Sequence, residues 1–432
     1  TFEWLHAQLA GSGDMLNALG LAVSSESFGA VLQFTALACF VVFIYQLAKK
    51  SDSEKGSVLT LFLVVSPVLI FLTTAPKPQL LPQTAVAIAL WLAVSKEEID
   101  TPVFVLICIL VMGAAQQKLS FYFTGGVIGV YALVKSLRTC GPGAIFPALA
   151  LGLFFFGPRF YWFFTENNGA INQMHTFGLP IEFLDNLKSI QENEWVFPLN
   201  LIIPGSAGKI TAVIGLIILY PFLIKKLNQK AVITATISMV AMGLFFFWGQ
   251  LTARFFFVFI LWGSVLMVFL PDKGIRLNLL KGMVLFQAII MMPLAVYAAY
   301  TLGPGGFSTS FRDAIMQRSA DGYTVGKWID ETLPRDAVIW CGVRSIVMIP
   351  REVVSSDWWR YIGKTKTDQE YLDFVEQKNI THILLQSKDP SDWITKYIGE
   401  RVAGPKKFVG GTRNPLNRQE QICSIFKFKP VE

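Results

Sequence analysis

Four basic residues stand where long apolar runs of the sequence begin or end: Lys77, Lys118, Arg159 and Arg254. A lysine or arginine at such a position needs a local partner, and a phosphate group fits because charge-assisted hydrogen bonds to phosphate are strong. Arginine can engage two phosphate oxygens at once. In the alternative interpretation, each side chain only extends to ordinary lipid head groups or pairs with a loop carboxylate. The four positions therefore predict a phosphate-binding site.

Carboxylates near these runs are candidates for a general base that would deprotonate an attacking hydroxyl or amine. The set comprises Glu3, Asp14, Glu166, Glu182 and Asp185, of which Glu3, Asp14 and Glu166 are the predicted catalytic residues. Glu3 comes first because it lies in the opening segment. The alternative is that each carboxylate is merely solvated. His6 and His175 are expected to contact an acceptor or the loops. They do not predict a metal site, because they lie far apart in the sequence.

The composition is too apolar for an ordinary soluble domain, with 53% hydrophobic and 16% charged residues among 432 and a mean hydropathy of +0.50. Charged residues are sparse from residue 27 to residue 301 and return to ordinary frequency from Arg312. We therefore predict a polytopic α-helical membrane domain over 1–301 and a soluble domain over 302–432. The formal charge of +7 does not predict nucleic-acid binding, because many lysines and arginines lie in short loops, where they set membrane orientation.

Ten apolar runs predict about ten membrane spans, several of them near the lower length limit for crossing about 30 Å of hydrocarbon. The runs cover about 28–48, 57–73, 80–95, 101–116, 119–135, 142–157, 209–224, 231–248, 253–270 and 279–301. The opening residues 1–24 are interrupted by a Gly-Ser-Gly-Asp turn and predict short interfacial helices. The loop 158–208 is long enough to be functional, and we expect an ordered, partly helical cover there.

Loop charges predict the orientation of these spans in the cytoplasmic membrane. One alternating set of loops is rich in lysine and arginine, including Lys49, Lys96, Arg138, Lys225 and Lys273, and is therefore predicted to be cytoplasmic. The start of the chain, the loop 158–208 and the C-terminal domain are then extracytoplasmic. An outward start is most simply explained by a further span upstream of Thr1.

The C-terminal region alternates between predicted helices and strands. Helices are predicted over 322–333 and 368–377, and strands over 336–341, 381–386 and 422–428. This alternation predicts a small soluble α/β domain on the outer face.

Four segments of the sequence carry a resemblance to a known family. "FLTTAPKPQLLPQTAVAIALWL" is similar to a post-helix stretch of that family in which a small polar cluster precedes Lys or Asp, and "GAAQQKLSFYF" to a segment ending in a lysine before an aromatic helix. "GQLTARFFFVFILW" is similar to the family's entry into a late span, and "GYTVGKWIDETLPRDAVIW" to the outer tail of its bacterial members. By these segments the chain resembles the GT-C superfamily of integral-membrane glycosyltransferases.

This resemblance implies an inverting transfer of a sugar from a polyisoprenyl-phosphate-linked donor at the outer membrane face. It implies that Lys77, Lys118 and Arg254 hold the donor phosphate, with Arg159 added from topology alone, and that a loop carboxylate acts as base. Family members place an Asp, often with Glu, soon after helix one. Glu3 and Asp14 do not stand in that context, so the resemblance also implies that the true base lies upstream of Thr1 or is missing.

Three functions are compatible with these features. The first is a glycosyltransferase, with the bilayer, a lipid-linked sugar donor and an acceptor of unidentified chemistry as its partners. The second is a non-catalytic subunit of the same fold that scaffolds other membrane subunits. The third is a transporter or flippase, which is disfavoured because the predicted spans contain almost no ionisable residues and no detectable inverted repeat. The sequence predicts no cofactor, although a divalent metal is compatible with the first function.

Overall fold

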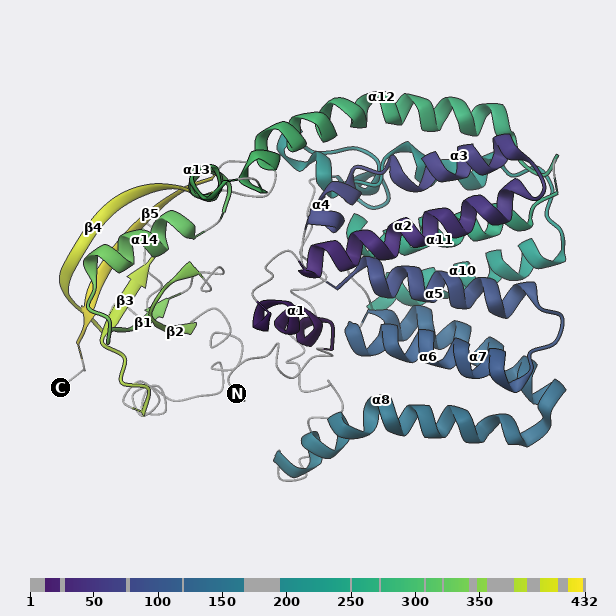
Figure 1. The fold of residues 1–432 in the computed structure, drawn as a ribbon, viewed down its shortest axis with the longest axis horizontal. Helices are drawn as coiled ribbons and strands as arrows, with labels where there is room; N and C mark the ends of the chain where they lie inside the picture. Colours follow the sequence, from purple (N-terminus) through teal and green to yellow (C-terminus); the bar gives the residue numbers. More distant parts are fainter. Residues whose placement is uncertain are drawn as a thin grey trace. The chain divides into compact units, whose positions relative to one another are not determined.

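A computed structural model gives the fold (Figure 1). The structure describes residues 12–23, 28–74, 78–118, 120–166, 195–248, 251–271, 273–306, 308–320, 322–341, 348–355, 377–386, 397–410 and 419–429. These residues form two compact units, which divide between Ala295 and Val296. The first unit is helical, and the second contains the β-sheet.

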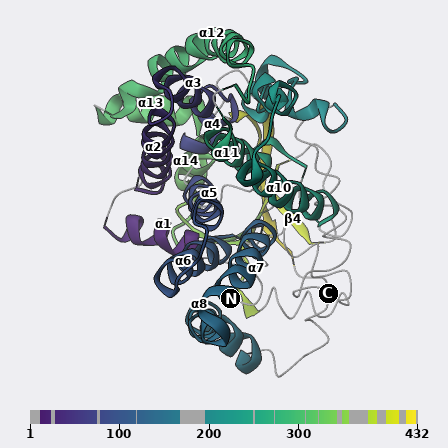
Figure 2. The ribbon, with the colours of Figure 1, turned by 90° about the vertical axis from the view of Figure 1, so that its right-hand side faces the viewer.

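The helical unit is a bundle of helices that run back and forth along one direction, seen side-on in Figure 1 and end-on in Figure 2. Its α-helices are α1 (Ser12–Ala22), α2 (Phe28–Lys49), α3 (Ser53–Val64), α4 (Val68–Thr74), α5 (Leu80–Ser95), α6 (Thr101–Gln117), α7 (Phe121–Cys140), α8 (Ile145–Glu166), α10 (Gln229–Trp248), α11 (Ala253–Phe269) and α12 (Leu277–Leu302). Short 3-10 helices lie between them: η2 (Gly141–Ala144), η4 (Leu199–Leu201), η5 (Ala207–Ala212) and η6 (Leu216–Leu223).

The opening segment 1–24, for which short interfacial helices are predicted, contains the helix α1. The residues from Thr1 to Gly11 of that segment lie outside the described part of the chain. The location of α1 at a membrane interface, and the further span predicted upstream of Thr1, therefore stay predictions.

The centre of the bundle is α11, in which every residue from Phe255 to Met267 is buried. A helix that is apolar on all sides is stable only when other helices surround it. Figure 2 shows α11 between α2, α5 and α10. The two ends of α11 therefore lie where the loops of its neighbours gather.

The structure supports fewer membrane spans than the ten predicted. Among the described residues, four stretches are long and apolar enough to cross a membrane: Phe28–Lys49, Phe121–Pro158, Gln229–Phe247 and Leu277–Gly305. The bent pair α3 and α4 would make a fifth, while Leu80–Ser95, Thr101–Gln117 and Ala253–Phe269 are shorter apolar helices. The unit is thus a helical body with four or five candidate spans.

Two predicted spans are not single α-helices. The run 57–73 is broken between α3 and α4, whose axes differ by 72°, and Pro67 lies at the break, where a missing N–H ends the helix. The run 209–224 forms the 3-10 helices η5 and η6 rather than an α-helix. Gly215, with φ of 89°, separates them, and Pro221 lies inside η6. Hydropathy alone does not reveal such interruptions.

These two interruptions meet inside the bundle, where Gln287 of α12 joins them. The Gln287 Oε1 accepts a hydrogen bond from the Ile217 N–H at 3.2 Å. The Gln287 Nε2 donates to the Val65 and Ile214 carbonyls at 3.0 and 2.9 Å. The Ser66 hydroxyl also donates to the Ile214 carbonyl, at 3.1 Å. Backbone that leaves its helix at membrane depth needs such partners, because lipid offers none.

At one end of the bundle, lysines cap the C-termini of neighbouring helices. The Lys55 Nζ donates to the Leu270 carbonyl after α11 at 2.9 Å, and the Lys230 Nζ donates to the Ser95 carbonyl of α5 at 2.7 Å. The final carbonyls of a helix have no partner inside the helix and carry partial negative charge, so a cation there stabilises the helix end. Some of the positive charge predicted to orient the protein therefore also holds these helix ends.

The second unit contains η7 (Gly303–Gly306), α13 (Thr309–Ser319), α14 (Tyr323–Thr332) and a five-stranded sheet of order β2-β1-β3-β5-β4. The strands are β1 (Val338–Cys341), β2 (Glu352–Ser355), β3 (His382–Leu385), β4 (Ile398–Gly410) and β5 (Gln419–Phe428). β1 pairs in parallel with β2 and β3, whereas β5 pairs antiparallel with β3 and β4.

The predicted α/β character of this unit is confirmed. The predicted helix 322–333 and strands 336–341, 381–386 and 422–428 correspond to α14, β1, β3 and β5. The edge strands β2 and β4 were not predicted, and the predicted helix 368–377 lies almost entirely outside the described residues. Trp328 of α14 packs on Phe408 of β4, with ring centroids 5.2 Å apart, so the helix covers the sheet.

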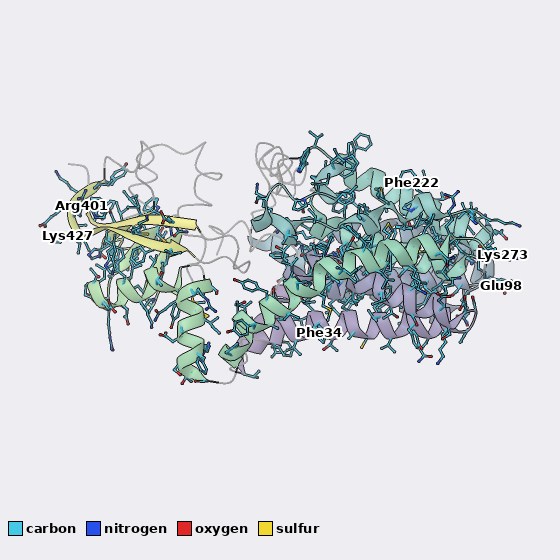
Figure 3. All side chains as sticks on the ribbon, turned by 90° about the horizontal axis from the view of Figure 1, so that it is seen from above. Phe34, Glu98, Phe222, Lys273, Arg401 and Lys427 are labelled. Atoms are coloured by element: carbon cyan, nitrogen blue, oxygen red, sulfur yellow. The ribbon has the colours of Figure 1, made fainter. Side chains whose placement is uncertain are left out.

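Acidification is expected to weaken the sheet through His382. Burial lowers the pKa of His382, and Lys427, its cross-strand partner on β5, lowers it further against the opposing effect of Asp336. Lys427 is labelled in Figure 3. Because the unfolded chain binds this proton more readily, stability is full above about pH 6.5 and falls as the pH drops through the lowered pKa.

Hydrogen exchange of the β3 amides measures this effect. After correction for intrinsic rates, protection should be lower below about pH 6 than above about pH 7. His382→Gln should remove the difference, and a variant that keeps the full pH dependence would contradict the role of His382.

Candidate functional site

Two of the predicted phosphate-binding residues come together on one aromatic ring. The Lys118 Nζ lies 4.6 Å from the centroid of the Phe255 ring, and the Arg254 Cζ lies 5.1 Å from the same centroid. Their separation cannot exceed the sum of these two distances. The helix ends that hold Lys118 and Arg254 therefore bring two positive groups to the same aromatic side chain.

Three helices position this pair. Lys118 caps the C-terminus of α6 with its N–H on the Ala114 carbonyl, and Arg254 lies in the first turn of α11. The Gln83 side chain, in the first turns of α5, donates from Nε2 to the Arg254 carbonyl at 2.8 Å. The N-termini of α5 and α11 thus lie together at this end, where their dipoles add positive potential that the C-terminus of α6, at Lys118, partly offsets.

The N-terminus of α5 is held by a glutamine from another helix. The Oε1 of Gln33, in α2, accepts from the N–H groups of Gln79 and Leu81 at 3.1 and 2.9 Å. This side chain satisfies N–H groups that a helix start leaves without an internal partner. Gln33 therefore fixes the position from which Gln83 reaches Arg254.

Buried polar side-chain atoms surround the pair. Within the described part of the chain, several of them make no hydrogen bond: both side-chain atoms of Gln79, the Oε1 atoms of Gln83 and Gln117, and the hydroxyls of Ser120 and Thr252. Buried polar atoms are nearly always satisfied in native proteins, so each such atom calls for a partner such as water or a ligand. These side chains lie within two residues of Lys118 or Arg254, or on the α5 segment that contacts Arg254.

An aromatic layer lies beside the pair. The ring of Phe255 is 6.0 Å from that of Phe245 in α10, and Phe245 also packs on Phe256 at 5.5 Å. Phe197 contacts Phe256 at 5.3 Å. The site therefore combines cations and amides with an apolar side, a combination suited to a ligand with a charged head and a hydrocarbon tail.

The other predicted site residues are not part of this described cluster. Glu3, His6, Lys77 and His175 lie outside the described residues. Asp14 lies on α1, and Arg159 and Glu166 lie on α8, but the structure does not describe their side chains. The prediction that the loop 158–208 begins after residue 157 is wrong, because α8 continues through Pro158 to Glu166.

The position of the general base is not decided by the described residues. Thr1 itself lies outside them, as does Glu3, the first of the candidate carboxylates. The hypothesis that the true base lies upstream of Thr1 therefore stays a prediction.

The amides of the site were missed by the sequence analysis. Gln33, Gln79, Gln83 and Gln117 all lie near the ends of apolar runs, which is the signal that also identified the cations. A neutral glutamine at such a position does not by itself predict a binding site, because placing it near a membrane costs less free energy than placing a charged side chain there.

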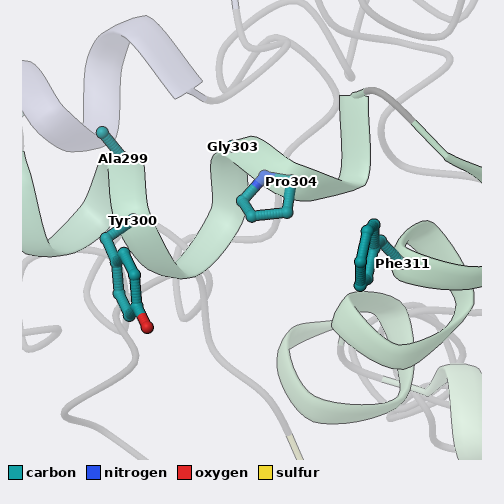
Figure 4. A pocket seen from close by; sticks show the side chains of 5 residues that line it. All are labelled: Ala299, Tyr300, Gly303, Pro304 and Phe311. Atoms are coloured by element: carbon teal, nitrogen blue, oxygen red, sulfur yellow. The ribbon is translucent and has the colours of Figure 1, made fainter.

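The described residues contain no group of three or more His, Cys, Asp and Glu side chains that could hold a metal ion. The sheet-containing unit has a shallow pocket of about 290 Å³, lined by Ala299, Tyr300, Gly303, Pro304 and Phe311 (Figure 4). Its lining is almost entirely apolar, with the Tyr300 hydroxyl as the one titratable side-chain group among these five residues.

The structure and site define a helical protein with candidate membrane spans, a cationic and amide-rich cluster at one bundle end, and a small α/β unit. Residues 1–316 match the DUF1420 N-terminal domain, and residues 317–430 match the DUF1420 C-terminal domain. The chain therefore belongs to the DUF1420 family. No curated protein matches it.

Proposed function

We propose that this protein is a membrane-embedded glycosyltransferase that takes a sugar from a polyisoprenyl-phosphate-linked donor. The observation that carries the proposal is the placement of Lys118 and Arg254 around Phe255, near buried amide and hydroxyl atoms that make no hydrogen bond within the described part of the chain. The resemblance of four sequence segments to the GT-C superfamily supports the same reaction class.

In this proposal the two cations bind the phosphate of the donor. As an acceptor hydroxyl or amine attacks the anomeric carbon, the bond from that carbon to the phosphate oxygen breaks, and the electron pair leaves with the phosphate. Lys118 and Arg254 stabilise the negative charge that develops there, which is usually the largest electrostatic contribution to such catalysis. A carboxylate takes the acceptor proton, with Glu3, Asp14 and Glu166 as the candidates.

The buried amides and hydroxyls would bind the sugar. A hexose presents several hydroxyl groups that each donate and accept, and Gln79, Gln83 and Thr252 offer the matching atoms. A site built to hydrogen-bond such hydroxyls discriminates strongly against a ligand without them, because its own polar groups would remain unpaired.

The proposal includes the orientation of the helical unit in the membrane that the loop charges predict. The bundle end that holds Lys118 and Arg254 faces outward, and the lysine-rich end faces the cytoplasm. The donor would then reach the site from the outer leaflet, with its isoprenoid tail in the bilayer and its phosphate at the helix ends.

Binding of a polyprenyl phosphate to the full chain in detergent tests the proposal. Each of Lys118→Gln and Arg254→Gln should weaken binding about 10- to 100-fold, because hydrogen bonds to a charged group contribute roughly 1.5–3 kcal/mol each. The same lipid as a free alcohol should bind weakly to every variant. Lys50→Gln and Arg138→Gln are matched controls. Both side chains are exposed and lie at the C-terminal ends of α2 and α7, at the lysine-rich end of the bundle and away from Lys118 and Arg254.

Unchanged affinity in both site variants, or an equal loss in the controls, would contradict the phosphate site. Tight binding of the sugar-bearing lipid without any transfer to an acceptor would instead favour a non-catalytic subunit of the same fold.

A further inference from the structure

A second basic surface lies at the lysine-rich end of the helical unit, on two loops that pair with each other. The loop before α10 and the loop after α11 are joined by an antiparallel bridge between Ile224 and Ile275. The Lys225 N–H donates to the Gly274 carbonyl at 2.8 Å, and the Arg276 N–H donates to the Leu223 carbonyl at 3.0 Å. These bonds make the two loops one platform.

Asn228 fixes this platform to the helices. Its Oδ1 accepts from the Ala231 N–H at 2.9 Å, which caps the start of α10. Its Nδ2 donates to the Phe269 carbonyl at the end of α11, at 2.6 Å. Gly274 permits the close approach of the loops, since a Cβ there would lie 3.0 Å from the Lys226 carbonyl oxygen and 2.8 Å from Pro271. The position of the platform is therefore set by the helix ends.

Four exposed cations project from the platform: Lys225, Lys226, Lys273 and Arg276. None of the four side chains makes a hydrogen bond, ion pair or ring contact with another described residue. Lys55 and Lys230 at the same end differ, because they cap helix carbonyls. The platform thus concentrates positive charge that the described part of the protein does not use.

The acidic residues at this end are largely engaged elsewhere. Asp52 caps α3, Asp100 caps α6, and Glu54 pairs with Lys281 at 2.6 Å. Glu97 and Glu98 lie on the loop between α5 and α6, and Figure 3 shows Glu98 and Lys273 at the same end of the unit. None of these described carboxylates forms an ion pair with the four cations of the platform, while Asp272, next to Lys273 in the sequence, lies outside the described residues.

An exposed apolar side chain stands next to these cations. Phe222, near the end of η6, is 78% exposed, and Leu227, which directly follows Lys225 and Lys226 in the sequence, is 43% exposed. Exposed aromatic residues beside lysines and arginines are typical of the boundary between the hydrocarbon and the head groups of a bilayer. A soluble anion would contact only the cations, whereas a phospholipid would contact the cations with its head group and Phe222 with its acyl chains.

We infer that the platform formed by residues 222–228 and 273–276 binds the head groups of anionic phospholipids in the adjacent leaflet. Clusters of basic residues at a membrane surface attract anionic lipids, and the paired loops hold these four in a fixed arrangement. The inference requires a membrane-embedded helical unit but not the proposed sugar transfer, since the platform follows the C-terminus of α11 and Arg254 lies in the first turn of that helix.

Native mass spectrometry of the full chain tests this inference, after extraction from vesicles of phosphatidylcholine mixed with phosphatidylglycerol. The wild type should retain phosphatidylglycerol in preference to phosphatidylcholine. The variant K225Q/K226Q/K273Q/R276Q should reduce that preference by roughly fivefold or more, since each basic residue near an anionic surface adds appreciably to the attraction. The pairs K225Q/K226Q and K273Q/R276Q should each give a partial loss.

The matched control is K49Q/K50Q/K96Q/R138Q, which also neutralises three lysines and one arginine. These four side chains are exposed and lie at the C-terminal ends of α2, α5 and α7, at the same end of the bundle as the platform. It should keep most of the preference. An equal loss in both quadruple variants would overturn the inference in favour of general attraction to the positive end. Displacement of the bound lipid by inorganic phosphate, or no preference in the wild type, would also overturn it.

Discussion

Gln287→Leu is expected to destabilise the helical unit by about 3–6 kcal/mol, because leaving a buried polar group unsatisfied costs roughly 1–3 kcal/mol for each group. The substitution preserves the approximate size of the side chain but removes all of its hydrogen bonds. It leaves the Ile217 N–H and the Val65 carbonyl without the partner that Gln287 supplies, and it weakens the bonding of Ile214. Because Gln287 is only 4% exposed, water does not replace it.

Unfolding of the full chain by titration with SDS measures this loss. Gln229→Leu is the matched control, since Gln229 is exposed at the first residue of α10, and it should change stability by less than about 0.5 kcal/mol. Ser66→Ala should fall between the two, at about 1 kcal/mol, because the hydroxyl makes one of the bonds to Ile214. A Gln287→Leu variant as stable as the control would show that the two interrupted segments do not depend on this side chain.

Arg351→Met is expected to have the second largest effect, about 3–5 kcal/mol on the sheet-containing unit, since hydrogen bonds to charged groups contribute roughly 1.5–3 kcal/mol each. The Arg351 side chain is 4% exposed and ends against the C-terminus of α14. Its Nε donates to the Pro334 carbonyl at 2.7 Å, and one terminal nitrogen donates to the Leu333 carbonyl at 2.7 Å. A single guanidinium thus binds several carbonyls that the helix leaves unsatisfied.

Two further variants separate the helix cap from the ion pair. Arg351 also pairs with Asp330 at 2.7 Å, but Asp330 is 59% exposed, so Asp330→Asn should cost less than about 1 kcal/mol. Arg351→Lys should lose most of the cap, because an ammonium cannot match the planar fork of donors. Hydrogen exchange of α14 and β1 in the full chain reports these losses, and Arg335→Met at an exposed position is the control. Equal effects of Asp330→Asn and Arg351→Met would contradict the cap.

Most helix positions could be predicted from the sequence, because apolar runs bounded by charged or helix-breaking residues set them. The predicted run 80–95 is α5, and the run 253–270 is α11 to within one residue. Where the prediction failed, at 57–73 and 209–224, the backbone leaves the α-helix and finds its partners far away in the chain. Gln287 lies 222 residues from Val65, and no local pattern reports such a bond.

The strands show a similar limit. β1, β3 and β5 contain short apolar runs that predict buried strands, whereas β4 contains Arg401, Lys406 and Lys407 around a Gly404-Pro405 pair. Such a segment reads as a loop. The strand forms because it pairs with β5, a contact that the local pattern does not report, and charged residues and proline are common on an edge strand, where they hinder pairing with another chain.

The site could be predicted only in part. Charges at the ends of apolar runs identified Lys118 and Arg254, but their meeting at Phe255 depends on α6 ending where α11 begins. That neighbourhood follows from the packing of the bundle, not from the local sequence. The glutamines escaped prediction for the same reason, since Gln83 is informative only once its contact with the Arg254 carbonyl is known.

The two ends of the bundle differ in how their cations are used. At one end, Lys55 and Lys230 satisfy helix carbonyls, so their charge is part of the fold. At the other end, Lys118 and Arg254 share an aromatic ring beside buried polar atoms that the described residues do not satisfy. The unsatisfied polar atoms around Lys118 and Arg254 support the proposal of a donor phosphate site at that end, separate from the lipid-binding platform proposed at the lysine-rich end.

A structure of the full chain with a bound polyprenyl phosphate tests the central claim most directly. The account predicts the phosphate within hydrogen-bonding distance, about 2.7–3.2 Å, of the Lys118 Nζ and the Arg254 guanidinium, with the first isoprene units against aromatic side chains. A structure in which no bound phosphate contacts Lys118 or Arg254 would contradict it.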